Sequence, residues 1–269
     1  MDRYVSRAIK SDLWLQVRIE VGLPEVQTVT PKQVLEEFSR SVGLKPGPPE
    51  RDIALLQARL PGPLPHEIRE LLGYSAGFDI DLGQLLTSRN RMVGPASIVF
   101  AGSGGLGLRN VLPFPVVLLG DGLGNFWAVD VSPDGAWGAV VFVCHDPPVV
   151  AIQAAELASF LGQVLDFRRR DPKDTLDYVR NEGTTRIWRD DPWLIAVEDA
   201  RRAQDAVVSS FASRLPDDFH VADLRSGETG RGFSWGKAGP DADIRRSGAD
   251  LLFGVEPKGP GFFRRLLSR

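Results

Sequence analysis

Three consecutive residues of this sequence, Cys144, His145 and Asp146, have side chains that could do chemistry. A thiol beside an imidazole could form a nucleophile–base pair, and all three side chains can ligate a metal. They follow an apolar run that is typical of a strand, however, and adjacent strand residues point to opposite faces. Cys144 and His145 therefore cannot pair directly, and three consecutive residues make a strained metal site. The sequence predicts no catalytic residue, no metal site and no cofactor here.

A second polar group, Asp121 and Asn125, lies in the glycine-rich run at residues 120–125. A calcium loop would need further spaced acidic ligands and a terminal glutamate, which are absent. The glycines tolerate positive φ and suit a loop that leads into a strand. We expect Asp121 and Asn125 to form, with His145 and Asp146, the rim of a surface that binds a partner. An enzyme whose site is built from these loop residues is an open alternative.

Two further glycine motifs lack the element that their chemistry requires. Residues 102–107 match the pattern GxGxxG, and Ser103 lies in a loose variant of the nucleophile elbow. Both motifs need a helix directly afterwards, but Pro113 and Pro115 follow instead. The sequence therefore favours neither a dinucleotide site nor a serine hydrolase.

Period-two alternation places the remaining candidate residues. Asp79 and Asp81 flank Ile80 and so share one face, which we expect to be solvated and not an acid–base pair. In the strand at residues 126–131, Trp127 lies on the face opposite Asp130. We include Asp79 and Trp127 among the predicted partner-binding residues.

The elements that must position these groups form a predicted β-meander. Residues 126–131 and 137–143 are strand-forming, and the turn Ser-Pro-Asp-Gly at 132–135 joins them as an antiparallel pair. We expect a last strand at 149–152 and an amphipathic helix at 153–167.

Composition excludes several classes of protein. The chain has 269 residues, 43% of them hydrophobic, a net charge of −3 and one cysteine. A mildly acidic chain gives no reason to expect direct nucleic-acid binding, and one cysteine allows no internal disulfide. The longest apolar run, residues 111–120, is too short to span a bilayer, and the first residues lack a continuous apolar block. We expect a cytoplasmic protein.

The sequence divides into three predicted parts. Residues 1–45 are a helical arm, with helices from Ser11 and from Thr30-Pro31 that pack on the main domain. Residues 46–167 form the main α+β domain. Residues 168–269 are a small C-terminal α+β extension, with helices that begin at residues 190–192 and strands near 219–224, 232–236 and 251–255. The arginines at 168–170 suit a helix end, and we expect the basic end at 261–269 to pack back onto the domain.

Three motifs, in order, resemble the SUKH superfamily, which includes the Smi/Knr cell-wall regulators of fungi and many bacterial immunity proteins. They are LPHEIRELL at residues 64–72 leading to YSAGF at 74–78, GDGLGNFWAVD at 120–130, and GAVVFVCHD at 138–146. The chain departs from the family pattern at Ala76-Gly77, where an asparagine–glycine pair is usual.

The resemblance implies an α+β fold with a mainly antiparallel sheet flanked by helices, and a binding function without catalysis. Many bacterial members are thought to bind and neutralise a cognate toxin, often a nuclease. The expected function is therefore that of an immunity protein, with a toxin or another protein as its partner. A regulatory or scaffold protein of the Smi/Knr type, for example in cell-envelope assembly, is the alternative. The oligomeric state is left open.

Overall fold

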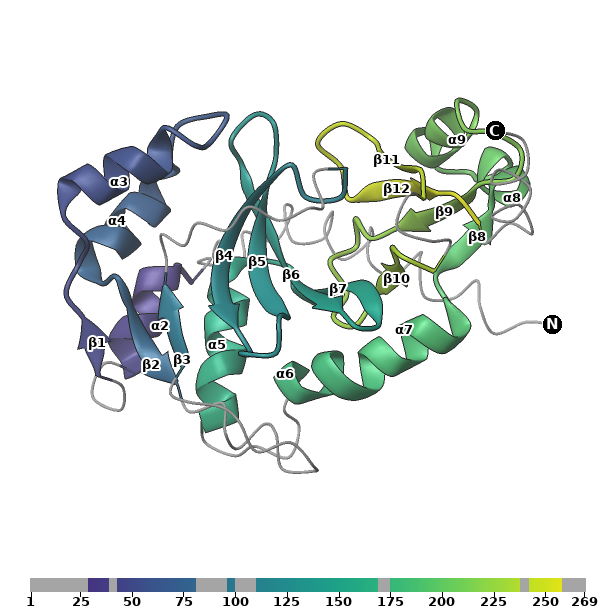
Figure 1. The fold of residues 1–269 in the computed structure, drawn as a ribbon. Coiled ribbons are helices and arrows are strands. Elements are labelled where there is room, and N and C mark those ends of the chain that lie inside the picture. Colours follow the sequence, from purple (N-terminus) through teal and green to yellow (C-terminus); the bar gives the residue numbers. More distant parts are fainter. Residues whose placement is uncertain are drawn as a thin grey trace, which may run out of the picture.

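The computed structural model describes residues 29–38, 43–80, 96–99, 110–168, 175–237 and 242–257. Within these ranges the chain has an α+β fold with three antiparallel sheets, as the sequence predicts (Figure 1). The predicted helix from Ser11, Asp81, the glycine loop at 102–107, arginines 169–170 and the basic end at 261–269 lie outside the described residues. Across the described ranges, no helix is long and apolar enough to cross a membrane.

The central sheet contains the predicted meander. Its strand order is β10-β7-β6-β5-β4. The strands are β4 (Phe114–Gly120), β5 (Phe126–Val131), β6 (Trp137–His145), β7 (Pro148–Ala154) and β10 (Gly232–Ser234). Alternation along β5 holds as predicted, because Trp127 packs into the core on one face and Phe126 packs against the core on the other. Trp127 packs against Phe142 of β6, with ring centroids 4.8 Å apart and the ring planes tilted by 43°.

Helices cover the first face, and a small sheet lies beside β4 on the left of Figure 1. The helices are α2 (Pro31–Phe38), α3 (Glu50–Gln57), α4 (His66–Tyr74) and α5 (Leu157–Arg168), and the sheet consists of β1 (Leu44–Lys45), β2 (Gly77–Ile80) and β3 (Ala96–Val99). Thr30 begins α2 with a capping box: its N–H donates to Gln33 Oε1 at 2.8 Å, and its Oγ1 accepts from the Gln33 N–H at 3.3 Å. Leu35 of α2 is buried in the first core, so this part of the predicted arm packs on the main domain.

A second sheet with two helices covers the other face. It contains β8 (Leu194–Ala196), β9 (His220–Asp223), β11 (Ile244–Arg246) and β12 (Leu252–Val255), with α8 (Val197–Arg201) and α9 (Ala206–Ala212) beside it. Phe233 and Phe253 share a core with Val141 and Ile152 of the meander. The Arg246 guanidinium donates to both carboxylate oxygens of Asp130, at 2.7 and 2.6 Å. The predicted division at residue 167 stays a prediction, but the segments on either side share a sheet and a core.

Two predicted helix boundaries are wrong. Helix α5 begins at Leu157 and not at Gln153, which belongs to β7, where its Oε1 accepts from Trp127 Nε1 at 2.9 Å. The buried indole therefore holds this glutamine in the strand. Residues 190–192 end a helix instead of opening one, because Asp191 adopts a left-handed conformation (φ 41°) that terminates it.

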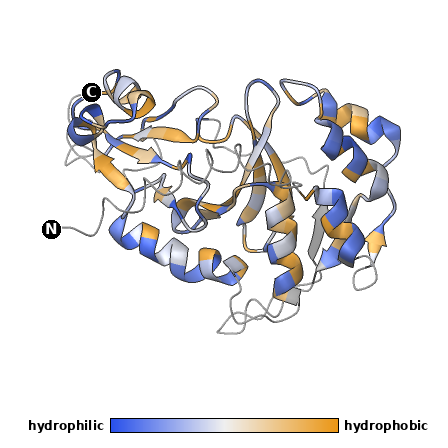
Figure 2. Ribbon diagram, turned by 180° about the vertical axis from the view of Figure 1, so that it is seen from behind, coloured by the Kyte–Doolittle hydropathy of each residue, from blue (hydrophilic) through white to orange (hydrophobic). Residues whose placement is uncertain are grey.

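The helix that ends at Asp190 was not predicted from the sequence. It runs over residues 175–190 as α6 (Thr175–Tyr178), a π-helical turn η2 (Val179–Gly183) and α7 (Thr184–Asp190). We call it helix 175–190. It contacts β7 and β10 at the edge of the central sheet. Most of α7 is hydrophilic, whereas α5 is mostly hydrophobic (Figure 2).

The turn of the β5–β6 hairpin packs against the loop before α4 through two glycines. A Cβ atom added at Gly62 would lie 2.6 Å from the Asp134 carbonyl oxygen and 2.8 Å from Gly135 Cα. Gly62→Ala should therefore lower the free energy of unfolding by about 1–3 kcal/mol, because backbone must move. Gly73→Ala in α4 is the control: nothing lies within 4 Å of its Cβ position, so better helix propensity should leave stability unchanged or raise it by up to about 1 kcal/mol. Urea denaturation measures both, and equal effects would contradict the close packing.

Candidate functional site

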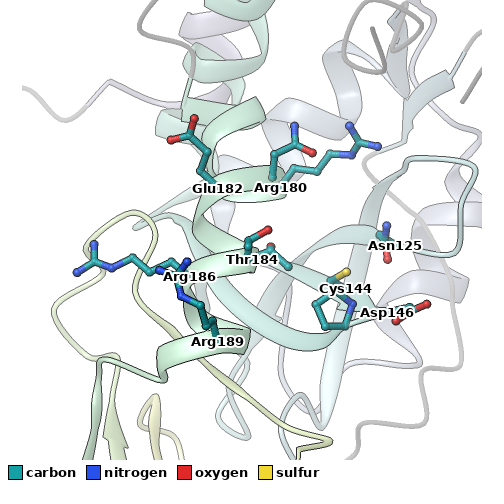
Figure 3. A pocket seen from close by; sticks show the side chains of 11 residues that line it. Asn125, Cys144, Asp146, Arg180, Glu182, Thr184, Arg186 and Arg189 are labelled. Atoms are coloured by element: carbon teal, nitrogen blue, oxygen red, sulfur yellow. The ribbon is translucent and has the colours of Figure 1, made fainter. Parts of the chain in front are cut away.

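An open groove of about 580 Å³ lies between the central sheet and helix 175–190 (Figure 3). Its hairpin wall consists of Asn125, Cys144, Asp146 and Pro147. Its helix wall includes the charged residues Arg180, Glu182, Arg186 and Arg189. A volume of this size is in the range of ligand sites, but the lining is more polar than is usual for a small-molecule pocket.

Asp121 is buried and supports Asn125 of the hairpin wall. Its Oδ1 accepts from the backbone N–H of Leu123 at 2.8 Å and of Asn125 at 3.1 Å. Its Oδ2 accepts from Asn125 Nδ2 at 2.7 Å and from Arg180 Nε at 3.3 Å. The side chains of Asp121 and Arg180 are 2% and 7% exposed. A buried carboxylate is tolerated only with such compensation, so the ion pair fixes the helix against the loop.

Asn125 connects Asp121 to His145 through hydrogen bonds of its side chain. Its Oδ1 accepts from the His145 backbone N–H at 3.1 Å and lies 2.9 Å from His145 Nδ1. Because the Asp121 carboxylate can only accept, the amide nitrogen of Asn125 must face Asp121 and its oxygen must face the imidazole. His145 Nδ1 therefore carries a proton, and in the neutral ring Nε2 is an acceptor. The partner of the His145 ring in the structure is therefore the Asn125 side chain.

Cys144 is buried, whereas its neighbour His145 is exposed. The Cys144 side chain packs in the first core and is 4% exposed, in agreement with the predicted alternation. Burial raises the pKa of the Cys144 thiol. The thiol at the groove is therefore in its weakly nucleophilic form at neutral pH, and no hydrogen bond joins it to His145.

The helix wall carries residues that the sequence reasoning missed. Arg189 pairs with Asp190 through two 2.8 Å hydrogen bonds, and the Arg186 guanidinium lies 5.1 Å from the centre of the Trp193 ring. Burial raises the pKa of the nearby Asp177 carboxyl, and Arg180 opposes this rise. The available signal was weak: the buried residues Leu176, Val179 and Ile187 are helically spaced, but a glycine and two threonines interrupt them.

The structure brings four of the six predicted binding residues together. Asp121, Asn125, His145 and Asp146 meet at the end of the β6–β7 hairpin, and His145 and Asp146 are exposed there.

The other two predicted residues lie elsewhere. Trp127 is fully buried in the core, where its indole N–H bonds to Gln153, so its assignment to a binding surface is corrected. Asp79 lies on β2 in the N-terminal sheet, where it is exposed and pairs with Lys45 at 2.9 Å, and it does not line the groove.

Within the described ranges, no group of three or more histidine, cysteine and acidic side chains is arranged to hold a metal ion. Comparisons with models of protein families, with curated proteins and with solved structures gave no match. A function for this chain therefore has to be inferred from the geometry and the charges of the groove.

Gly124 leaves the space that the His145 ring fills. A Cβ atom there would lie 2.9 Å from His145 Cε1, and the residue has a φ of +94°. Gly124→Ala should therefore displace the imidazole and break its bond to Asn125, and ¹H–¹⁵N spectra of the ring should lose the signature of a protonated Nδ1. Gly122→Ala is the matched control, since its φ is +73° but nothing lies within 4 Å. Both variants carry about 1–2 kcal/mol of backbone strain, so an unchanged imidazole spectrum in Gly124→Ala would contradict this contact.

Proposed function

We propose that the chain is a non-enzymatic protein-binding protein, and that it acts as an immunity protein that binds and neutralises a cognate toxin. The observation that carries this proposal is the network from Arg180 through Asp121 and Asn125 to His145. It holds an exposed, polar rim in one arrangement at the mouth of an open groove.

Preorganisation makes such a rim suitable for binding. Ordering side chains on association costs free energy, and that cost is smaller where the groups are already fixed. Here the loop, the hairpin end and helix 175–190 are joined through one buried carboxylate. A partner therefore meets a rim whose hydrogen-bonding groups are already oriented.

The charge of the rim favours a basic partner. Asp146 on the hairpin wall and Glu182 on the helix wall are exposed, and in the part of the chain that the structure describes neither forms an ion pair. The whole chain has a net charge of −3. Complementary charge steers association and suppresses wrong partners, so a nuclease toxin, which is basic where it binds nucleic acid, fits this rim.

The sequence motifs support the same proposal. Of the motifs that resemble the SUKH superfamily, the one at residues 120–130 begins beside the groove with Asp121 and Asn125, and the one at 138–146 ends at the hairpin wall. The buried, protonated Cys144 thiol and the separate placement of His145 also favour binding over covalent chemistry at the groove.

The test begins with recovery of the partner by affinity purification of the full chain from its native cells. Asp146→Lys should weaken the complex at least about tenfold, or about 1.4 kcal/mol, because it sets a like charge against a basic partner. Glu198→Lys makes the same charge change on exposed α8, away from the groove, and should leave the affinity unchanged. Calorimetry measures both.

Three outcomes would contradict the proposal: equal affinity of both variants and the wild type, binding of nucleic acid in place of protein, or turnover of a small molecule by the pure protein. Co-expression decides between immunity and regulation. If the captured protein arrests growth when expressed alone, and the wild-type chain but not Asp146→Lys restores growth, the partner is a toxin. A captured envelope-assembly protein without toxicity would favour the regulatory or scaffold role.

A further inference from the structure

One cation at the groove differs from the others. Of the three arginines that line it, Arg180 is buried against Asp121, and Arg189 is engaged by Asp190. Arg186 is exposed and, among the described residues, forms no ion pair. Its guanidinium instead lies over the Trp193 ring, 5.1 Å from the centroid. In Figure 3 it lies with Arg189 on the side of the groove opposite Asn125, Cys144 and Asp146.

We propose, resting on the protein-binding function above, that Arg186 is the anchor in the groove for a carboxylate of the partner, supplied by an aspartate or glutamate side chain. A guanidinium presents paired N–H donors that match the two oxygens of a carboxylate. The cation–π contact with Trp193 restrains the guanidinium, so less side-chain entropy is lost when the carboxylate binds.

The surrounding charges select a carboxylate over a phosphate. Arg180 and Arg189 already serve Asp121 and Asp190, so one guanidinium is available, which neutralises one negative charge. The carboxylates of Asp146 and Glu182, which form no ion pair within the described ranges, line the same groove. They repel a dianion more strongly than a single carboxylate.

Such an anchor fixes the orientation in which the partner binds. Basic groups of the partner are drawn to the acidic rim in many orientations, because such attraction is not directional. A single site of opposite sign accepts only the orientation that brings a carboxylate to Arg186, and like-charge contacts penalise the others. The groove therefore selects among basic proteins the one with a carboxylate at the matching place.

The partner provides the first test. Arg186→Glu should weaken the purified complex about 30-fold or more, because it removes the anchor and opposes the carboxylate. Arg186→Lys keeps the charge without the planar fork and should weaken it about three- to tenfold. Arg214→Glu makes the same reversal at an exposed residue after α9 and should leave affinity unchanged. Circular dichroism and urea denaturation check that each variant is folded.

A second test needs no partner. The full chain, labelled with ¹⁵N, is titrated with acetate, which carries a single carboxylate, and, separately, with inorganic phosphate, and the Arg Nε–H signals are followed by NMR. Acetate should shift the Arg186 signal at least about three times as much as that of Arg214. An equal response of the two arginines, or a larger response to phosphate, would overturn the assignment.

The two proposals fail separately. If the partner binds Arg186→Glu as tightly as the wild type while Asp146→Lys is weakened, the carboxylate anchor is wrong and the protein-binding function stands. If no protein binds but the Arg186 signal responds to acetate, the anion site is real and the protein-binding function is wrong.

Discussion

The ion pair between Asp121 and Arg180 joins the two parts of the molecule that make the groove. Asp121 is in the loop before β5, and Arg180 is in the π-helical turn of helix 175–190. Both side chains are almost fully buried, where an unpaired charge costs several kcal/mol. The pair therefore stabilises the inward position of Asp121 in the loop and of Arg180 in the helix together, and so holds the two walls of the groove against each other.

A second buried pair, Asp130 with Arg246, repeats this arrangement at the other end of β5. The side chains are 5% and 6% exposed, and the guanidinium also donates to the carbonyl oxygen of Val111 at 2.9 Å. In both pairs the carboxylate flanks or belongs to β5 and the arginine comes from the last third of the chain. Together with β10, which extends the central sheet beside β7, they attach that last third to the meander. Residues 180–189, which belong to the predicted extension, therefore form one wall of the groove.

The functional proposals rest on the charged groups of the groove that ion pairs do not neutralise. Arg180 and Asp121 neutralise each other inside, and Arg189 and Asp190 do so outside. What the groove still presents is Asp146, Glu182 and Arg186, which are exposed and in the described residues form no ion pair. This small set of opposite charges, held on a rigid frame, favours recognition of another protein over catalysis. Because Nδ1 of His145 donates to Asn125, Nε2 of the neutral ring is a directional acceptor at the same rim.

Local patterns alone determined the meander, the helices α2 and α5, the strands β9, β10 and β12, and the approach of Asp121, Asn125, His145 and Asp146. Period-two alternation, proline and glycine turns and helix caps act between neighbours, so they can be read from the sequence. Only the tertiary structure decided that Trp127 is buried, that Gln153 stays in a strand, and that residues 175–190 form a helix with a π-helical turn. Each of these depends on a partner distant in the sequence: Gln153 for Trp127, and Asp121 for Arg180. A buried polar group takes whichever partner the completed fold places beside it, and for that reason the helix wall of the groove was not predicted.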